Sequence, residues 1–168
     1  MTANGVETAT ITNTQLGTDV AARTVGVTGT SLTKMTVVSS GLAPVTINGG
    51  GTKLTEIDAS GVAGVVTIGA ASAAAGVKIT TGGGADTITG GAGADTLIGG
   101  GGIDTITGGL GVDTLTGGDK ADTFIYAANV AGAVVSSLAA PDVITDFTSG
   151  TDKPVSYTHL TLPTKRIV

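Results

Sequence analysis

Five aspartates recur at intervals of nine residues in the middle of the chain, each behind a glycine-rich stretch. They are Asp86, Asp95, Asp104, Asp113 and Asp122. Carboxylates spaced this evenly along a repeating backbone come together when the repeats stack, and carboxylate oxygens are ligands for hard cations. The chemistry that this pattern predicts is metal binding by oxygen atoms.

The repeat unit around each aspartate has two halves. It reads GGxGxDxUx, where U is a large apolar residue, and segments 90–98, 99–107 and 108–116 match it at every position. Glycines permit positive φ, so the first six residues can form a tight turn. The last three residues form a short strand whose middle side chain points opposite to its neighbours. The predicted core residues are therefore Ile88, Leu97, Ile106, Leu115 and Phe124.

These units must stack, because three-residue strands cannot satisfy their backbone groups alone. With two units per coil the stacking period is eighteen residues. Asp86, Asp104 and Asp122 then line one edge of the stack, and Asp95 and Asp113 line the other.

Calcium fits the oxygen atoms that such an edge offers. It takes about 6 to 8 oxygen ligands in tolerant geometry, which two carboxylates and several turn carbonyls can supply. Magnesium demands stricter octahedral geometry, and zinc prefers His or Cys, which the repeats lack. Ion binding and folding are then one process. A flexible glycine-rich linker is the alternative, but a linker does not require an apolar residue two positions after every aspartate.

Charge is distributed in blocks along the chain. Residues 1–80 carry four acidic and four basic side chains, whereas residues 81–152 carry nine acidic side chains against Lys120 alone. This acidic block repels nucleic acid and attracts cations. No stretch is long and apolar enough to span a membrane. We therefore expect no nucleic-acid partner and no membrane span.

Residue types for catalysis are scarce. The chain has no cysteine, and its one histidine is His159; it contains neither HExxH nor GxSxG. A zinc protease needs the first motif, and a serine hydrolase needs a histidine base. The chain is expected not to be an enzyme and to have no catalytic residues.

Residues 1–80 are rich in Thr, Val and Ala and favour short strands. Aromatic residues make up only 2% of the chain, which favours thin layers of aliphatic side chains. The segment is expected to be all-β, as a β-sandwich-like unit or as a β-solenoid continuous with the repeats. The predicted strands are 8–12, 24–28, 35–39, 45–48, 53–57, 65–69 and 77–80.

The chain beyond the repeats changes character twice. Residues 126–153 form the predicted closing segment, with Asp142, Asp146 and Asp152 near the end of the stack. Residues 154–168 contain two of the four prolines and no acid, and they are expected to be a non-native or disordered tail. The predicted division is therefore 1–80, 81–125, 126–153 and 154–168.

The repeats from Thr81 to Ile125 resemble the RTX, or haemolysin-type calcium-binding, nonapeptide repeat family. The likeness continues more weakly through "APDVITDFTSGTDK". Two positions depart from the pattern: Thr81 replaces the first glycine, and Lys120 replaces the third glycine of the last unit. The resemblance implies a parallel β-roll in which each calcium ion lies between units n and n+2, held by two aspartates and by turn carbonyls.

Carried over to this chain, the resemblance implies about three calcium ions. One site would use Gly82, Gly84, Asp86, Gly99, Gly101 and Asp104. A second would use Gly91, Gly93, Asp95, Gly108, Leu110 and Asp113. A third would use Gly100, Gly102, Asp104, Gly117, Asp119 and Asp122, with Asp119 contributing only its carbonyl and Lys120 weakening the site. In each case the aspartates contribute side chains and the other residues contribute carbonyls.

The resemblance also implies export by type I secretion machinery, with folding outside the cell where calcium is abundant. The composition of residues 1–80 is similar to that of bacterial surface-layer (S-layer) proteins, whose partners include copies of themselves in a surface lattice. The expected function is a calcium-folded module of a secreted, structural surface protein. The alternative is the C-terminal module of a secreted enzyme, toxin or adhesin whose active domain lies outside this chain.

Overall fold

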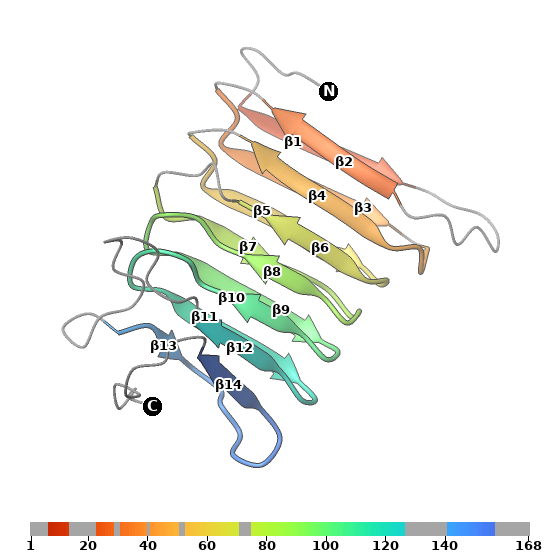
Figure 1. Cartoon of the computed structure of the whole chain (residues 1–168). Helices are drawn as coiled ribbons and strands as arrows, with labels where there is room; N and C mark the ends of the chain where they lie inside the picture. The colour runs from red at the N-terminus through yellow and green to blue at the C-terminus, as the bar shows by residue number, and fades with distance from the viewer. Residues whose placement is uncertain are drawn as a thin grey trace.

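The computed structural model describes residues 7–13, 23–28, 31–39, 41–50, 53–70, 75–126 and 141–156. These residues form two seven-stranded parallel sheets. Figure 1 shows the strands of both sheets stacked along one direction, from β1 and β2 at one end to β13 and β14 at the other. The predicted all-β solenoid is confirmed. In the part of the chain described, no helix is long and apolar enough to cross a membrane.

Consecutive strands alternate between the two sheets, so each coil of the chain contributes one strand to each. The first sheet contains β1 (Thr8–Asn13), β3 (Lys34–Ser39), β5 (Glu56–Val62), β7 (Lys78–Thr80), β9 (Thr96–Gly101), β11 (Thr114–Asp119) and β13 (Val143–Ile144). The second sheet contains β2 (Arg23–Thr28), β4 (Val45–Gly50), β6 (Val66–Gly69), β8 (Thr87–Thr89), β10 (Thr105–Thr107), β12 (Thr123–Tyr126) and β14 (Lys153–Ser156).

The N-terminal strands continue the same solenoid as the repeats. Strand β6 pairs with β8, and β7 pairs with β9, so both sheets run past residue 80 without interruption. Contacting residues of successive coils are 22 apart in sequence for Lys34 and Glu56, 20 apart for Val66 and Asp86, and 18 apart for Asp86 and Asp104. The coils therefore shorten toward the repeats, where they reach the predicted period.

The core contains one continuous row of large buried side chains along each sheet, and the longer N-terminal strands add further buried residues such as Val37 and Ala59. All five core residues predicted in the repeats, Ile88, Leu97, Ile106, Leu115 and Phe124, are 0% exposed. The same two rows continue upstream through Met35, Ile47, Ile57, Ile68 and Ile79. Because neighbouring strands lie about 4.8 Å apart, each of these side chains packs directly on the next. This stacking explains how a chain with so few aromatic residues fills its interior.

One predicted strand was misplaced: segment 53–57 overlaps β5 only at its end, because β5 runs from Glu56 to Val62. Thr55 lies before the strand, where its N–H and hydroxyl both donate to the Thr33 carbonyl, at 2.9 and 3.1 Å. The Ser60-Gly61 pair reads as a turn signal in sequence. In the structure, a register shift between Thr36 and Val38 keeps β5 paired with β3 across Gly61.

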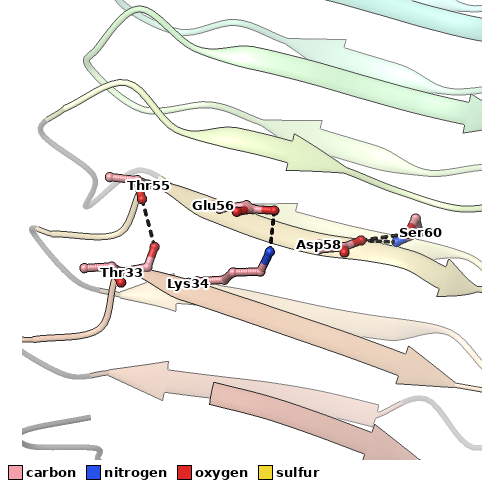
Figure 2. A network of polar contacts seen from close by, with 6 residues as sticks. All are labelled: Thr33, Lys34, Thr55, Glu56, Asp58 and Ser60. Carbon is pink, nitrogen blue, oxygen red and sulfur yellow. Dashed lines mark hydrogen bonds and ion pairs between the residues drawn. The ribbon is translucent and has the colours of Figure 1, made fainter. Parts of the chain in front are cut away.

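Three charged residues on the outer face of the N-terminal coils, Lys34, Glu56 and Asp58, have polar partners within the chain (Figure 2). Lys34 Nζ lies 2.8 Å from Glu56 Oε1. Asp58 Oδ1 accepts hydrogen bonds from the Ser60 N–H and hydroxyl, at 3.1 and 2.7 Å. Glu56 and Asp58 lie on either side of the buried Ile57 in β5, so both point to the outer face. The ion pair joins two successive coils, and the hydrogen bonds of Asp58 order the backbone of one coil. Neither contact requires a metal ion.

The described C-terminal residues close the stack. Strand β13 pairs with β11, and β14 pairs with β12. Pro154 is tolerated in β14 because this is an edge strand. Residues 154–156, which the sequence assigned to the tail, therefore lie in a sheet. The rest of the predicted tail, 157–168, stays a prediction. Residues 127–140 and 157–168 lie outside the described residues.

Candidate metal centre

The five repeat aspartates form two rows, one along each edge of the solenoid. Along one edge the Asp86 N–H donates to Asp104 Oδ1 at 2.8 Å, and the Asp104 N–H donates to Asp122 Oδ1 at 2.9 Å. Along the other edge the Asp95 N–H donates to Asp113 Oδ1 at 2.8 Å. The structure therefore brings these side chains together in the two rows that the period of eighteen predicts.

Every aspartate in these rows is buried, with at most 1% of its surface exposed. Burying a carboxylate is costly unless its oxygens have partners. The Oδ2 atoms of Asp86, Asp104 and Asp122 are buried and have no hydrogen-bond partner. In Asp95 the corresponding atom accepts the Gly91 N–H at 2.6 Å. Three buried acceptor atoms along one edge therefore need a cation or a proton.

Burial raises the pKa of Asp86, Asp95, Asp104 and Asp122 above its ordinary value, because the charged form loses its hydration. For Asp104 the pKa rises to about 6, mainly through this desolvation, and the neighbouring carboxylates of Asp86 and Asp122 add to the rise. Its hydrogen bond from the Asp86 N–H and the charge of Lys120 act in the opposite direction. Without a metal ion, the middle of this row holds a proton more readily than an ordinary aspartate does.

Glycine at the first position of a unit makes room for the aspartate five residues later. A Cβ on Gly99 would lie 2.3 Å from Asp104 Oδ2, and one on Gly117 would lie 2.2 Å from Asp122 Oδ2. A Cβ on Gly108 would likewise lie 2.2 Å from Asp113 Oδ2. No side chain fits at these distances. The space beside each carboxylate is therefore enclosed by turn backbone, whose polar atoms are amides and carbonyls.

The turns that carry the predicted carbonyl ligands are stacked on one another. The Gly82 carbonyl accepts the Gly101 N–H at 2.8 Å, and the Gly91 carbonyl accepts the Leu110 N–H at 3.1 Å. A carbonyl oxygen has two lone pairs, so one remains for an ion. The other predicted carbonyl residues precede the aspartates in the same coils. Gly84, Gly93, Gly102 and Gly108 lie outside the strands, whereas Gly99 and Gly100 lie at the end of β9 and Gly117 and Asp119 at the end of β11.

The turn before Asp122 departs from the others at Lys120. This residue has a φ of 81°, which makes it the one non-glycine residue with positive φ in the described part of the chain. Glycines occupy the equivalent positions two residues before Asp104 and Asp113, with φ of 133° and 114° at Gly102 and Gly111. The neighbouring Asp119 is exposed, as expected for a residue offering only its carbonyl. Lys120 therefore adopts a conformation that the glycine turn imposes.

Sequence reasoning placed Asp142 and Asp152 near the end of the stack but did not predict that they end the two rows of aspartates. Downstream, the Asp113 N–H donates to Asp142 Oδ1 at 3.2 Å, and the Asp122 N–H donates to Asp152 Oδ1 at 3.0 Å. Asp142 and Asp152 each lie two residues before a strand residue that pairs with the core row. Ile144 pairs with Leu115, and Pro154 pairs with Phe124. The spacing of two residues from aspartate to core residue could have identified Asp142 and Asp152 from the sequence. The spacing is hard to recognise because most of the repeat glycines are absent before these two aspartates.

Within the residues described, no three His, Cys, Asp or Glu side chains gather closely enough to hold a metal ion alone. A cation in these rows must therefore also take backbone oxygens. Two carboxylates together with turn carbonyls form an all-oxygen donor set, which suits a hard ion of flexible coordination. The orphaned Oδ2 atoms and the turn backbone packed against them fit calcium.

Comparison with known families matches residues 78–106 and 107–125 to the RTX calcium-binding nonapeptide repeat, in 4 copies. The matched residues extend from β7 into β12 and include all five repeat aspartates. No curated protein and no solved structure matches the chain. The N-terminal coils and the closing segment lie outside the matched residues.

Proposed function

Because residues 78–125 of this chain are RTX calcium-binding nonapeptide repeats, we propose that the protein is a calcium-folded module of a secreted bacterial surface protein. Its role is to bind calcium and thereby to fix the repeat coils in the solenoid. The observation that carries the proposal is the row of buried Oδ2 atoms on Asp86, Asp104 and Asp122, which have no hydrogen-bond partner.

Three ions are proposed, each between aspartates of successive coils on the same edge. Two lie along the first row, between Asp86 and Asp104 and between Asp104 and Asp122. The third lies along the second row, between Asp95 and Asp113. The turn carbonyls of Gly82, Gly84, Gly91, Gly93, Gly99, Gly100, Gly101, Gly102, Gly108, Leu110, Gly117 and Asp119 complete the ligand sets.

The ion supplies positive charge where the fold stacks negative charge. The chain's own residues hold each carboxylate in place through the N–H groups that donate to Oδ1, such as those of Asp86 and Asp104. Without calcium, like charges repel along the row and the buried carboxylates lack hydration. Calcium removes both penalties, so binding and folding of the repeats are coupled.

We further propose secretion by a type I route and a structural role at the cell surface. Calcium-dependent folding suits a chain that must stay unfolded in a low-calcium cytosol and fold outside. The Thr-rich N-terminal coils continue the solenoid and carry paired charges on their outer face, which favours a structural role over a catalytic one. The second candidate is the C-terminal module of a secreted enzyme, toxin or adhesin, whose active domain lies outside this chain.

A calcium titration followed by far-UV circular dichroism tests the folding role, with magnesium as the control ion. A cooperative gain of β-signal with calcium alone is expected. A spectrum that ignores both ions would contradict the proposal. Sedimentation velocity at saturating calcium then separates the two candidates. Large calcium-dependent assemblies support the surface-layer role, and a monomer at all concentrations favours the module of a larger protein.

A further inference from the structure

The turn that closes the solenoid, residues 146–152, lies outside the residues matched to the family. It nevertheless follows the backbone plan of the repeats. Lys153 pairs with Thr123, and Thr123 pairs with Thr105, so Asp152 stands in the same column as Asp104 and Asp122. The Lys153 N–H donates to the Asp122 carbonyl at 2.8 Å, as the Thr123 N–H does to the Asp104 carbonyl at 2.8 Å.

The side chain of Asp152 also repeats the contacts of a repeat aspartate. Its Oδ1 accepts the Asp122 N–H at 3.0 Å. Its Oδ2 accepts the N–H of Thr148, four residues earlier, at 2.7 Å. Asp95 makes the same contact with Gly91, four residues earlier, at 2.6 Å. Asp152 is only 9% exposed, so it is held inside the stack as the repeat aspartates are.

The local turn geometry agrees with this equivalence. Gly150 stands two residues before Asp152 and has a φ of 90°, which is positive like the φ of 133°, 114° and 81° at the residues two positions before Asp104, Asp113 and Asp122. The turn is one residue longer than those of the repeats, because β13 and β14 pair at Ile144 and Lys153 with Leu115 and Thr123. The extra length begins at Asp146, whose carboxylate accepts the N–H groups of Gly117 and Gly118 at 3.0 and 2.7 Å.

Asp122, which contacts Asp152 through its N–H, has one buried atom without a partner. Asp122 is 1% exposed, its Oδ1 accepts the Asp104 N–H, and its Oδ2 has no hydrogen-bond partner. The carboxylate of Asp152 lies beside Asp122 in the next coil, where its Oδ1 accepts the Asp122 N–H at 3.0 Å. The end of the row thus concentrates negative charge around a buried acceptor.

We propose that the closing turn is a degenerate repeat unit and that it completes a further calcium site between Asp122 and Asp152. Carbonyls of the two stacked turns supply the remaining oxygens. This site rests on the proposed calcium-binding function and adds one ion to the three in the repeats. It ends the array with a metal ion that ties β14 to β12.

The test is the number of calcium ions bound by the full chain, counted by native mass spectrometry and by isothermal titration. Asp152→Asn keeps the oxygen that accepts the Asp122 N–H and removes the charge. Asp58→Asn makes the same change on the outer face of β5, away from both rows. We expect four ions in the unchanged chain and in Asp58→Asn, and three in Asp152→Asn.

The outcomes separate the two proposals. If the unchanged chain and Asp152→Asn both bind three ions, the closing-turn site is wrong and the repeat sites stand. If the unchanged chain binds none, the proposed function itself is wrong. Should Asp152→Asn not fold, the count in the unchanged chain decides, because four ions support the closing-turn site and three overturn it.

Discussion

Val66 donates its backbone N–H to Asp86 Oδ1 at 2.7 Å, and the two residues hold equivalent places in successive coils, since Thr67 pairs with Thr87. On the other edge Val77 stands in the same relation to Asp95, at 2.8 Å. Upstream of Asp86 the equivalent positions hold Val45 and Val66, and upstream of Asp95 they hold Thr55 and Val77; the three valines are at most 2% exposed. Downstream both columns hold aspartates. One backbone plan therefore contains coils without carboxylates at this position followed by coils that bury them.

Asp104 belongs to two of the proposed sites, so its charge matters most. Asp104→Asn keeps an oxygen for the Asp86 N–H but removes the carboxylate. We expect the calcium concentration at the folding midpoint to rise at least about tenfold, which corresponds to about 1.4 kcal/mol. Circular dichroism measures the midpoint. Asp58→Asn is the control and should leave it unchanged; an equal shift in both variants would show that the effect is not site-specific.

Gly99 is required because a Cβ there would lie 2.3 Å from Asp104 Oδ2. Gly99→Ala should displace that carboxylate and prevent calcium-dependent folding of the neighbouring coils. Gly69→Ala is the matched control, since a Cβ at Gly69 would meet nothing within 4 Å. Calcium-dependent thermal unfolding compares the two variants. A Gly99→Ala protein that is as stable as Gly69→Ala would refute the proposed packing.

Lys120 occupies a left-handed turn position with a φ of 81°. For a non-glycine residue this conformation costs roughly 1–2 kcal/mol, and the lysine charge competes with a cation beside Asp104 and Asp122. Lys120→Gly should therefore raise the melting temperature and lower the calcium midpoint. Lys53→Gly removes the same charge from an exposed turn residue that lacks positive φ. Equal changes of melting temperature and calcium midpoint in both variants would contradict this prediction, because they would show that the position of Lys120 does not matter.

The raised pKa of Asp104 gives the calcium-free fold a definite pH dependence. Its ordinary value is 3.8, and burial raises it to about 6 in the folded chain, so the folded state binds more protons than the unfolded state between these values. Stability without calcium should consequently fall as pH rises from about 4 to about 6. Because protons compete with calcium for the same carboxylates, the calcium midpoint should be higher at pH 5 than at pH 7.5. Denaturant unfolding in chelator at several pH values checks the first claim, and stability that rises over this range would contradict it.

The repeats could be read from sequence because their period is local and strict. Spacing alone predicts the buried row from Ile88 to Phe124 and the two rows of aspartates. The continuity of the N-terminal coils could not be decided in the same way, because their lengths vary and Val66 and Val77 occupy the aspartate position without any motif. Their equivalence with Asp86 and Asp95 depends on strand register, which exists only once the sheets form.

One local error and one incomplete prediction have similar origins. Ser60-Gly61 looks like a turn, but β5 passes through it because the partner strand β3 shifts register nearby. Asp152 was placed near the end of the stack but not in the row of aspartates, because its unit keeps only Gly150 of the expected glycines. Its hydrogen bond to the Asp122 N–H spans 30 residues, a distance across which no local pattern predicts contact.

Hydrogen exchange of the full chain, with calcium and with chelator, tests the central claim most directly. The amides of β3 to β7 should be protected under both conditions, because their coils are closed by apolar residues and by pairs such as Lys34 with Glu56. At pH 7.5 the amides of β8 to β12 should be protected only with calcium, since their coils bury carboxylates that are charged at this pH. Protection of β8 to β12 that is equal in calcium and in chelator would contradict calcium-coupled folding of this solenoid.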